Sequence, residues 1–348
     1  KRLLEHFIEI VKNASGNAGQ KLSEIEMTTD EERSLILNDF NATETEYPRD
    51  KTVVELFEEQ VAKTPDNIAL VFEDEKLTYS ELNARANSLA HKLREIGVKP
   101  DDFVAIIADR SIEMIAGIYG IIKAGGAYVP IDPTYPEDRI SFMLEDCQPK
   151  AVLKFTTESI NISDEIPVID LRNSEVWEGA SEDPEHVNTP NDLIYCIYTS
   201  GTTGQPKGSI IENKSVVRLV KNTNYIELDE HNIILQTGSM SFDASTLEVW
   251  GAFLNGGKLI LAEKEVITDN VRFRALLKKE KVNTMWLTST LFNQMISEEN
   301  DIFDNLEHLL IGGEKLSDDH VRIMKKRKNG VKLTNGYGPT ENTTFTTT

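Results

Sequence analysis

Apolar and polar residues alternate along residues 48–348 with two different periods. Stretches in which apolar residues recur every three or four positions predict helices, and short apolar runs bounded by turn-forming residues predict strands. The predicted helices are 52–63, 80–96, 112–124, 245–254 and 271–281. The predicted strands are 103–108, 127–131, 151–155, 168–171, 193–198, 233–236, 258–261, 284–288, 308–311 and 331–334. This alternation predicts an α/β fold with largely parallel sheets flanked by helices.

Residues 1–47 follow a different pattern. Helical spacing is shown by Leu3, Leu4, Phe7, Ile8 and Val11, and after a polar, glycine-containing break at 13–20 by Leu35, Ile36 and Phe40. Thr28 and Glu31 have the spacing of a capping box that would open the second helix. Two short helices around a polar break indicate an interdomain linker that packs on a neighbouring domain, although the pattern also fits an N-terminal decoration. We therefore expect a linker at 1–47 and one large domain at 48–348.

Composition narrows the classes of function. Lys and Arg number 37 and Asp and Glu 58, which gives a net charge of −21. A chain this acidic is a poor general binder of nucleic acid or anionic membrane. The longest apolar run, 114–122, is stopped by Lys123 and is shorter than the ~18 residues that a membrane span needs. The two cysteines, Cys147 and Cys196, are too few for a disulfide framework, so we expect a cytoplasmic protein.

The loop Tyr198-Thr-Ser-Gly-Thr-Thr-Gly-Gln-Pro-Lys-Gly208 has the composition of a phosphate cradle. Glycines let backbone amides face an anion, hydroxyls donate further hydrogen bonds, and Lys207 adds positive charge. It is not a Walker A loop, because Pro206 precedes the lysine and a glycine follows it. On composition alone, the loop equally fits a flexible connection between two strands.

The whole eleven-residue string resembles the signature of the adenylate-forming enzyme superfamily. Four further segments resemble other core motifs of that superfamily in the same order, namely 77–82, 123–132, 242–245 and 335–341. The second of these has the form typical of nonribosomal peptide synthetases, and residues 1–47 are similar to the linker between a condensation and an adenylation domain. The resemblance covers essentially the whole chain. It implies the large N-terminal core of an adenylation domain, with the acyl-CoA synthetase/luciferase-like fold.

The reaction that the resemblance implies joins two anions. An amino-acid carboxylate attacks the α-phosphate of ATP, pyrophosphate leaves, and the aminoacyl group passes to a phosphopantetheine thiol on a partner carrier domain. Such an enzyme must neutralise charge and align groups rather than supply covalent chemistry.

The resemblance also assigns roles to individual residues. The catalytic residues would be Lys207, Thr340, which would contact the α-phosphate, and Glu341, which would bind Mg²⁺. ATP would be bound by Thr199, Ser200, Gly201, Thr202, Thr203, Gly204, Gly312, Gly313, Glu314, Asn335, Gly336 and Tyr337, the last against adenine. Taken singly, Tyr337 also fits a core aromatic at a turn, and Glu341 fits a residue at a helix start; the joint pattern favours the functional interpretation.

Asp243 is the candidate partner for the substrate ammonium group, because a partly buried carboxylate is the natural partner of a free amino acid. It also fits the N-cap of helix 245–254. The resemblance gives a substrate pocket of Phe242, Asp243, Ala244, Leu247, Trp286, Leu310, Gly312, Gly336, Thr344 and Phe345. Apart from Asp243 these are apolar, small or hydroxyl-bearing, as expected for valine. Neighbouring aliphatic substrates would differ by only ~1–3 kcal/mol per methylene, and Trp286 and Leu310 also fit plain core packing.

Two departures from the family pattern affect these expectations. Asn213 stands where a histidine is common, and the sequence stops at Thr348, just after the fifth motif. The later Thr-Gly-Asp motif and the small C-terminal subdomain with its catalytic lysine are not among these residues, so we expect a truncated and impaired fragment or a piece of a longer chain. The alternatives are an acyl- or aryl-CoA synthetase, which Asp243 and the linker disfavour, and a noncatalytic module.

Overall fold

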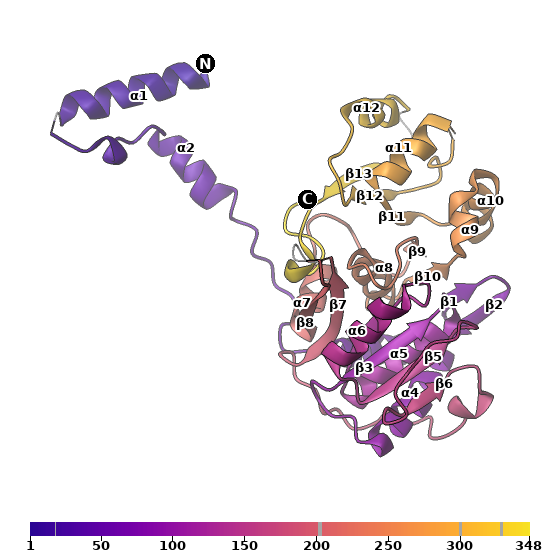
Figure 1. The fold of residues 1–348 in the computed structure, drawn as a ribbon. Coiled ribbons are helices and arrows are strands. Elements are labelled where there is room, and N and C mark those ends of the chain that lie inside the picture. The colour runs from indigo at the N-terminus through magenta and orange to yellow at the C-terminus, as the bar shows by residue number, and fades with distance from the viewer. Residues whose placement is uncertain (18, 201–203, 299–300, 328–329) are drawn as a thin grey trace. The chain divides into compact units, whose positions relative to one another are not determined.

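The computed structural model describes residues 1–17, 19–200, 204–298, 301–327 and 330–348. The chain divides into two compact units, Lys1–Glu46 and Tyr47–Thr348 (Figure 1). Within the described ranges, no helix is both long enough and apolar enough to cross a membrane.

The first unit contains α1 (Arg2–Gly16), a 3₁₀ turn η1 (Leu22–Glu24), α2 (Asp30–Ser34) and a π-helical turn η2 (Leu35–Asp39). The predicted capping box of Thr28 and Glu31 is wrong, because Thr29 caps α2 by accepting the amide of Glu32 at 3.2 Å. Because Thr28 and Thr29 are each followed three residues later by a glutamate, the sequence fits a cap at either threonine. The Glu32 carboxylate pairs with Arg2 at 2.7 Å and with His6. The reciprocal bond of a capping box, from the Thr29 amide to this carboxylate, is therefore not formed.

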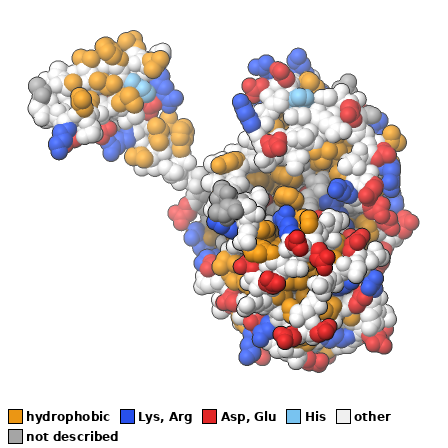
Figure 2. All heavy atoms as spheres, viewed as in Figure 1, with side chains coloured by type: hydrophobic (Ala, Val, Ile, Leu, Met, Phe, Trp, Pro, Cys, Tyr) orange, Lys and Arg blue, Asp and Glu red, His pale blue; other side chains and the backbone are white. Residues whose placement is uncertain are grey.

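Apolar side chains of the first unit stay on its surface (Figure 2). Leu3, Phe7 and Phe40 are 86%, 62% and 64% exposed, and α1 and α2 bury none of their residues. The described residues of this unit therefore form no hydrophobic core of their own.

The second unit contains two mostly parallel sheets. The seven-stranded sheet has the order β13 (Lys332–Gly336), β12 (His308–Gly312), β11 (Thr284–Thr288), β9 (Ile233–Gln236), β10 (Lys258–Leu261), β1 (Ile68–Phe72) and β2 (Glu75–Thr78). The six-stranded sheet has the order β6 (Val168–Asp170), β5 (Ala151–Phe155), β3 (Phe103–Ala108), β4 (Ala127–Ile131), β7 (Leu193–Thr199) and β8 (Lys207–Glu212). Only the pairs β1–β2 and β7–β8 are antiparallel among these described strands. The predicted α/β class is confirmed.

Helices cover the sheets in layers. The main core is shared by both sheets and by α3 (Val53–Lys63), α4 (Tyr79–Ile96), α5 (Ile112–Ala124), α7 (Asn213–Val220) and α8 (Ala244–Phe253). The other face of the seven-stranded sheet packs on α9 (Lys264–Thr268), α10 (Asn270–Glu280), α11 (Ser289–Glu298) and α12 (Asp318–Lys326), and that of the six-stranded sheet on α6 (Glu137–Cys147). Successive residues of β3 face different cores: Ile106 lies in the main core, and Ile107 lies in the core that contains α6.

Most of the predicted elements are present, and several others were missed. The strands at 103–108, 127–131 and 151–155 coincide with β3, β4 and β5. The helix α6 was missed although Ile140, Met143, Leu144 and Cys147 have helical spacing and are buried. The hairpin β1–β2, the helices α7, α9, α11 and α12 and the strand β8 were also missed. Two short 3₁₀ turns, η3 (Ser174–Val176) and η4 (Thr340–Asn342), complete the described elements.

Candidate functional site

Two of the predicted motif segments, 242–245 and 335–341, and the predicted ATP-binding residues 312–314 lie at one edge of the seven-stranded sheet. The loops that follow β9, β12 and β13 begin at Thr237, Gly313 and Tyr337. Because β9, β11, β12 and β13 run parallel to one another, their carboxyl ends share an edge, where ligands of α/β sheets commonly bind. The fold thus gathers residues that are up to a hundred positions apart in the sequence.

The predicted phosphate loop forms the tip of the β7–β8 hairpin. Thr199 pairs with Lys207 and Tyr198 pairs with Gly208 across the two antiparallel strands. Gly201, Thr202 and Thr203 lie outside the described residues. Ser200, Gly204 and Lys207 are exposed, so the described part of the tip is open to a ligand.

A hydrogen bond and close packing fix the base of this hairpin. The Tyr198 hydroxyl donates to the Asp146 carboxylate of α6 at 2.5 Å, and burial raises the pKa of Tyr198. A Cβ atom at Gly208 would lie 2.6 Å from Sγ of Cys196 and 3.3 Å from the Tyr198 ring. The glycine after Lys207 is therefore required by the close approach of the two strands.

Asn213, which departs from the family pattern, has a structural contact. Its side chain accepts the amide of Val53 at 3.3 Å and donates to the carbonyl of Asp192 at 3.0 Å. It is buried and joins the start of α3 to the segment that leads into β7.

Asp243 lies at the N-cap position of α8, but its side chain makes no capping hydrogen bond within the described helix. The position is therefore that of the N-cap alternative, without a side-chain capping bond of the usual kind. Burial raises the pKa of Asp243, while hydrogen bonds from the Thr340 hydroxyl and from the amides of Asp243 and Ala244 act in the opposite direction. The charge of Glu341 raises the pKa further. The carboxylate of Asp243 thus interacts with both Thr340 and Glu341.

The remaining pocket candidates are mostly packed against one another. Ala244, Leu247, Leu310, Thr344 and Phe345 are buried, and Trp286 packs against the main core. Nε1 of Trp286 is buried and has no hydrogen-bond partner among the described residues. An unpaired indole N–H of this kind costs free energy unless another group reaches it.

Gly312 and Gly336 are needed for close packing at this edge. A Cβ atom at Gly312 would lie 2.4 Å from the carbonyl oxygen of Gly336, and one at Gly336 would lie 2.4 Å from the Phe345 ring. That ring meets Tyr225 edge-on, with centroids 5.7 Å apart. The space beside Gly336, one of the predicted pocket residues, is thus filled by Phe345.

Tyr337 and its neighbours line the exposed side of the same edge. Tyr337 is 68% exposed, so the alternative of a core aromatic is wrong, and its main chain bridges to Thr347. Asn335, Gly313, Glu314 and Glu341 are exposed too. Glu341 lies in the turn η4, and Glu314 accepts a hydrogen bond from Thr290 at 2.8 Å.

Sequence reasoning missed two neighbouring features. Thr343 and Thr344 have φ angles of +57° and +70°, which are unfavourable for β-branched residues. A cavity of about 710 Å³ lies beside Phe242 and is lined in part by Arg110, Asp132 and Lys264. Neither feature has a signal in the apolar pattern, because both depend on how distant loops meet.

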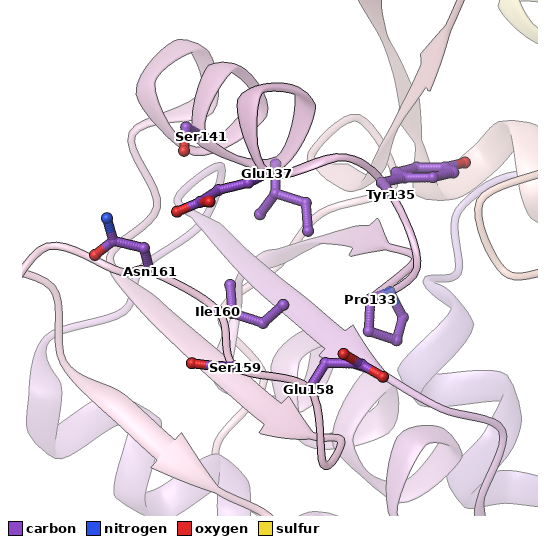
Figure 3. A pocket seen from close by; sticks show the side chains of 9 residues that line it. Pro133, Tyr135, Glu137, Ser141, Glu158, Ser159, Ile160 and Asn161 are labelled. Atoms are coloured by element: carbon purple, nitrogen blue, oxygen red, sulfur yellow. The ribbon is translucent and has the colours of Figure 1, made fainter.

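A second, smaller cavity of about 120 Å³ lies beside α6 (Figure 3). Glu137 and Ser141 of α6 and Ser159, Ile160 and Asn161 of the segment after β5 line it. It contains none of the motif residues, so we do not include it in the site.

Comparison with known proteins agrees with this arrangement. Residues 57–348 match the family model described as AMP-binding enzyme. The chain is 45% identical over 347 residues to gramicidin S synthase 2 of Brevibacillus brevis, an alignment that covers 100% of this chain and 8% of that synthase. PA1221, an NRPS protein containing adenylation and PCP domains, matches with a TM-score of 0.78 and 30% identity over 85% of this chain and 51% of that chain. The N-terminal subdomain of Klebsiella oxytoca NpsA matches with a TM-score of 0.78 and 25% identity over 85% of this chain and 77% of that chain.

Proposed function

The chain belongs to the AMP-binding enzyme family, and from this premise we propose that it activates an amino acid with ATP, as aminoacyl-AMP, for nonribosomal peptide synthesis. The observation that carries the proposal is the Asp243 carboxylate, which makes no capping bond and lies beside Thr340 and Glu341. A carboxylate in this position suits an ammonium group. The relative gramicidin S synthase 2 is a peptide synthase by name, and this chain spans less than a tenth of it.

The proposed division of roles follows from where each group lies. Asp243 binds the ammonium group, and Thr340, whose hydroxyl now bonds to Asp243, turns toward the α-phosphate. Thr199, Ser200 and Lys207 at the hairpin tip hold the triphosphate, and the exposed ring of Tyr337 lies against adenine. The protein thus supplies charge neutralisation and alignment, which is what attack of one anion on another requires.

Glu341 is the candidate ligand for Mg²⁺. Its carboxylate is exposed at the same edge, and Mg²⁺ commonly takes one or two protein carboxylates together with phosphate oxygens and water. The residues present therefore fit the ion, which would neutralise phosphate charge when bound.

We propose an apolar substrate, with valine as the first choice. Ala244, Leu247, Leu310 and Phe345 offer no charge to a substrate side chain. The product would pass to the phosphopantetheine thiol of a carrier domain, as the pairing of adenylation and PCP domains in PA1221 suggests.

We further propose that residues 1–348 alone form the adenylate more slowly than a longer protein that includes them. The family resemblance assigns a charge-neutralising lysine to a C-terminal subdomain that is not among these residues. Loss of one preorganised charged group commonly costs ~10²–10³ in rate. Single-turnover adenylate formation compares the two, and rates within a few-fold would contradict this proposal.

Amino-acid-dependent ATP–pyrophosphate exchange in the full-length protein tests the proposed function. Valine should give the fastest exchange, with isoleucine and leucine next, and fatty or aryl acids should give none. Faster exchange with fatty or aryl acids would favour an acyl- or aryl-CoA synthetase, and a preference for Asp, Lys or Arg would overturn the apolar pocket.

A further inference from the structure

The guanidinium of Arg110 binds the main chain at the carboxyl ends of two strands. Nη1 donates to the carbonyls of Ala262 at 2.8 Å and Gln236 at 3.3 Å, and Nη2 donates to those of Thr237 at 2.7 Å and Gly238 at 2.9 Å. Arg110 follows β3 of the six-stranded sheet, whereas these carbonyls end β9 and β10 of the seven-stranded sheet. One side chain therefore ties the two sheets together next to the loop that leads to Asp243.

Glu248 holds the same segment from its other side. Its side chain is fully buried in α8. Oε1 accepts the amides of Thr237 at 2.9 Å and Gly238 at 3.4 Å. The carbonyls of these two residues are thus held by Arg110 and their amides by Glu248. We call Arg110, Glu248, Thr237 and Gly238 the 237–238 clamp.

The Thr237 hydroxyl extends the clamp to the proposed substrate pocket. Its oxygen lies 2.6 Å from the carbonyl of Trp286 and 3.0 Å from Oε1 of Glu248. A hydroxyl has one hydrogen, and the carbonyl can only accept. When that hydrogen points to Trp286, the contact with Glu248 is a hydrogen bond only if Glu248 carries a proton and donates it.

The surroundings of Glu248 favour this protonated form. Burial raises the pKa of Glu248 to about 7, opposed by hydrogen bonds from Thr237 and by the charge of Arg110. Burial lowers the pKa of Arg110, and the charges of Glu248, Asp132 and Glu265 act against that shift. Oε2 of Glu248 has no partner among the described residues, and an unpaired neutral oxygen costs less than an unpaired charged one.

We propose that Arg110 and Glu248 are positioning residues for amino-acid binding, because the 237–238 clamp fixes the loop that carries Asp243 and, through the Thr237 hydroxyl, the main chain of Trp286. The inference rests on the proposed role of Asp243. Neither residue touches the substrate: both act through the main chain, and a protonated Glu248 can also donate to the Thr237 hydroxyl when that hydroxyl donates to the Trp286 carbonyl. ATP, bound by the hairpin tip and the β13 loop, does not depend on it.

Four variants of the full-length protein separate this role from plain packing. Thr237→Val removes the hydroxyl with little change of volume, and Arg110→Met removes four donors. Glu248→Gln keeps the size of the side chain and, with its oxygen at the position of Oε1, an acceptor for the two amides, but it removes the group that titrates. Arg94→Met is the matched control, because Arg94 also donates to main-chain carbonyls, those of Lys123, Ala124 and Glu185, none of which belongs to the 237–238 clamp or to the loop that carries Asp243.

The readouts are the KM for valine, the KM for ATP and kcat in ATP–pyrophosphate exchange. Thr237→Val and Arg110→Met should raise the KM for valine about tenfold and leave the KM for ATP within about threefold. Arg94→Met should change neither. Equal increases in both KM values, or the same effect in Arg94→Met, would overturn the inference. Should Arg110→Met fail to fold by circular dichroism, the single-oxygen change in Thr237→Val decides alone.

The pH profile tests the proton on Glu248. In the native protein the KM for valine should rise as the pH increases from 6 to 8, whereas in Glu248→Gln it should stay near the native value at pH 6 throughout. The same pH dependence in both proteins would show that protonation of Glu248 does not affect valine binding. If the native protein shows no exchange with any amino acid, the proposed function fails; if it is active and the variants match it, only the clamp fails.

Discussion

The hydroxyl of Thr344 donates a hydrogen bond of 2.8 Å to the main-chain carbonyl of Asp243. This bond joins the segment after β13 to the start of α8. Thr344 has a φ of +70°, so it keeps an unfavourable backbone conformation while making the contact. The bond explains how Thr340, four residues earlier, comes to lie beside the Asp243 carboxylate.

The bond between Thr344 and Asp243 should matter for both stability and substrate binding. Thr344→Val removes the donor at nearly constant volume and should lower the free energy of unfolding by about 1 kcal/mol, while raising the KM for valine. Thr344→Ser keeps the hydroxyl and is the control. Urea unfolding and exchange kinetics measure the two effects, and equal behaviour of the two variants would show that the hydrogen bond is unimportant.

Asp243→Ala tests the ammonium partner directly. Without the carboxylate the substrate cation has no counter-charge, so kcat/KM for valine should fall on the order of 10²-fold or more. The KM for ATP should move little, because the hairpin tip is unaffected. Asp243→Asn keeps the size and hydrogen-bonding capacity and should lose nearly as much. Equal losses for both substrates would indicate a structural defect instead.

Gly208→Ala tests the base of the phosphate hairpin. The added Cβ would lie 2.6 Å from Sγ of Cys196, so the strands must move apart and the tip with them. We expect a several-fold higher KM for ATP and an unchanged KM for valine. Cys196→Ala removes the clashing sulfur, so the double variant should recover part of the loss. If the double variant recovers nothing, the clash with Cys196 is not the cause of the loss, and the Tyr198 ring or another contact prevents a side chain at position 208.

The fold could be predicted from the sequence more fully than the site. Apolar runs such as those of β3 and β4 are buried on both faces of a parallel sheet and predict strands well. The choice between Thr28 and Thr29 as a cap could not be made, because both have a glutamate three residues later. That Phe345 fills the space beside Gly336 depends on the left-handed turn at Thr343 and Thr344, which no local preference of threonine predicts.

Candidate site residues could be predicted from the sequence where a motif contains them, and not where no motif does. A motif singled out Asp243, whose role in binding the ammonium group is proposed, but no motif singled out Arg110 and Glu248. A buried arginine or glutamate has no distinctive spacing in the sequence. Its function appears only when its main-chain partners, here Thr237 and Gly238, are known.

Glu248 should make stability depend on pH, with a sign set by its raised pKa. Burial raises its pKa to about 7 in the folded chain, above the ordinary value of 4.5, so between these values the folded state holds a proton that the unfolded state has lost. Stability from this group is therefore complete below about pH 4.5, falls as the pH rises toward 7, and is constant above it. The full difference corresponds to about 3 kcal/mol.

Comparison of the native chain with Glu248→Gln isolates this contribution, because the amide does not titrate and other groups cancel in the difference. The free energy of unfolding, measured in urea between pH 5 and pH 8, should fall more steeply in the native chain than in Glu248→Gln and level off above pH 7. Parallel curves for the two proteins would show that Glu248 has the same pKa folded and unfolded, and would then require the Thr237 hydroxyl to donate to a charged Glu248 rather than to the Trp286 carbonyl.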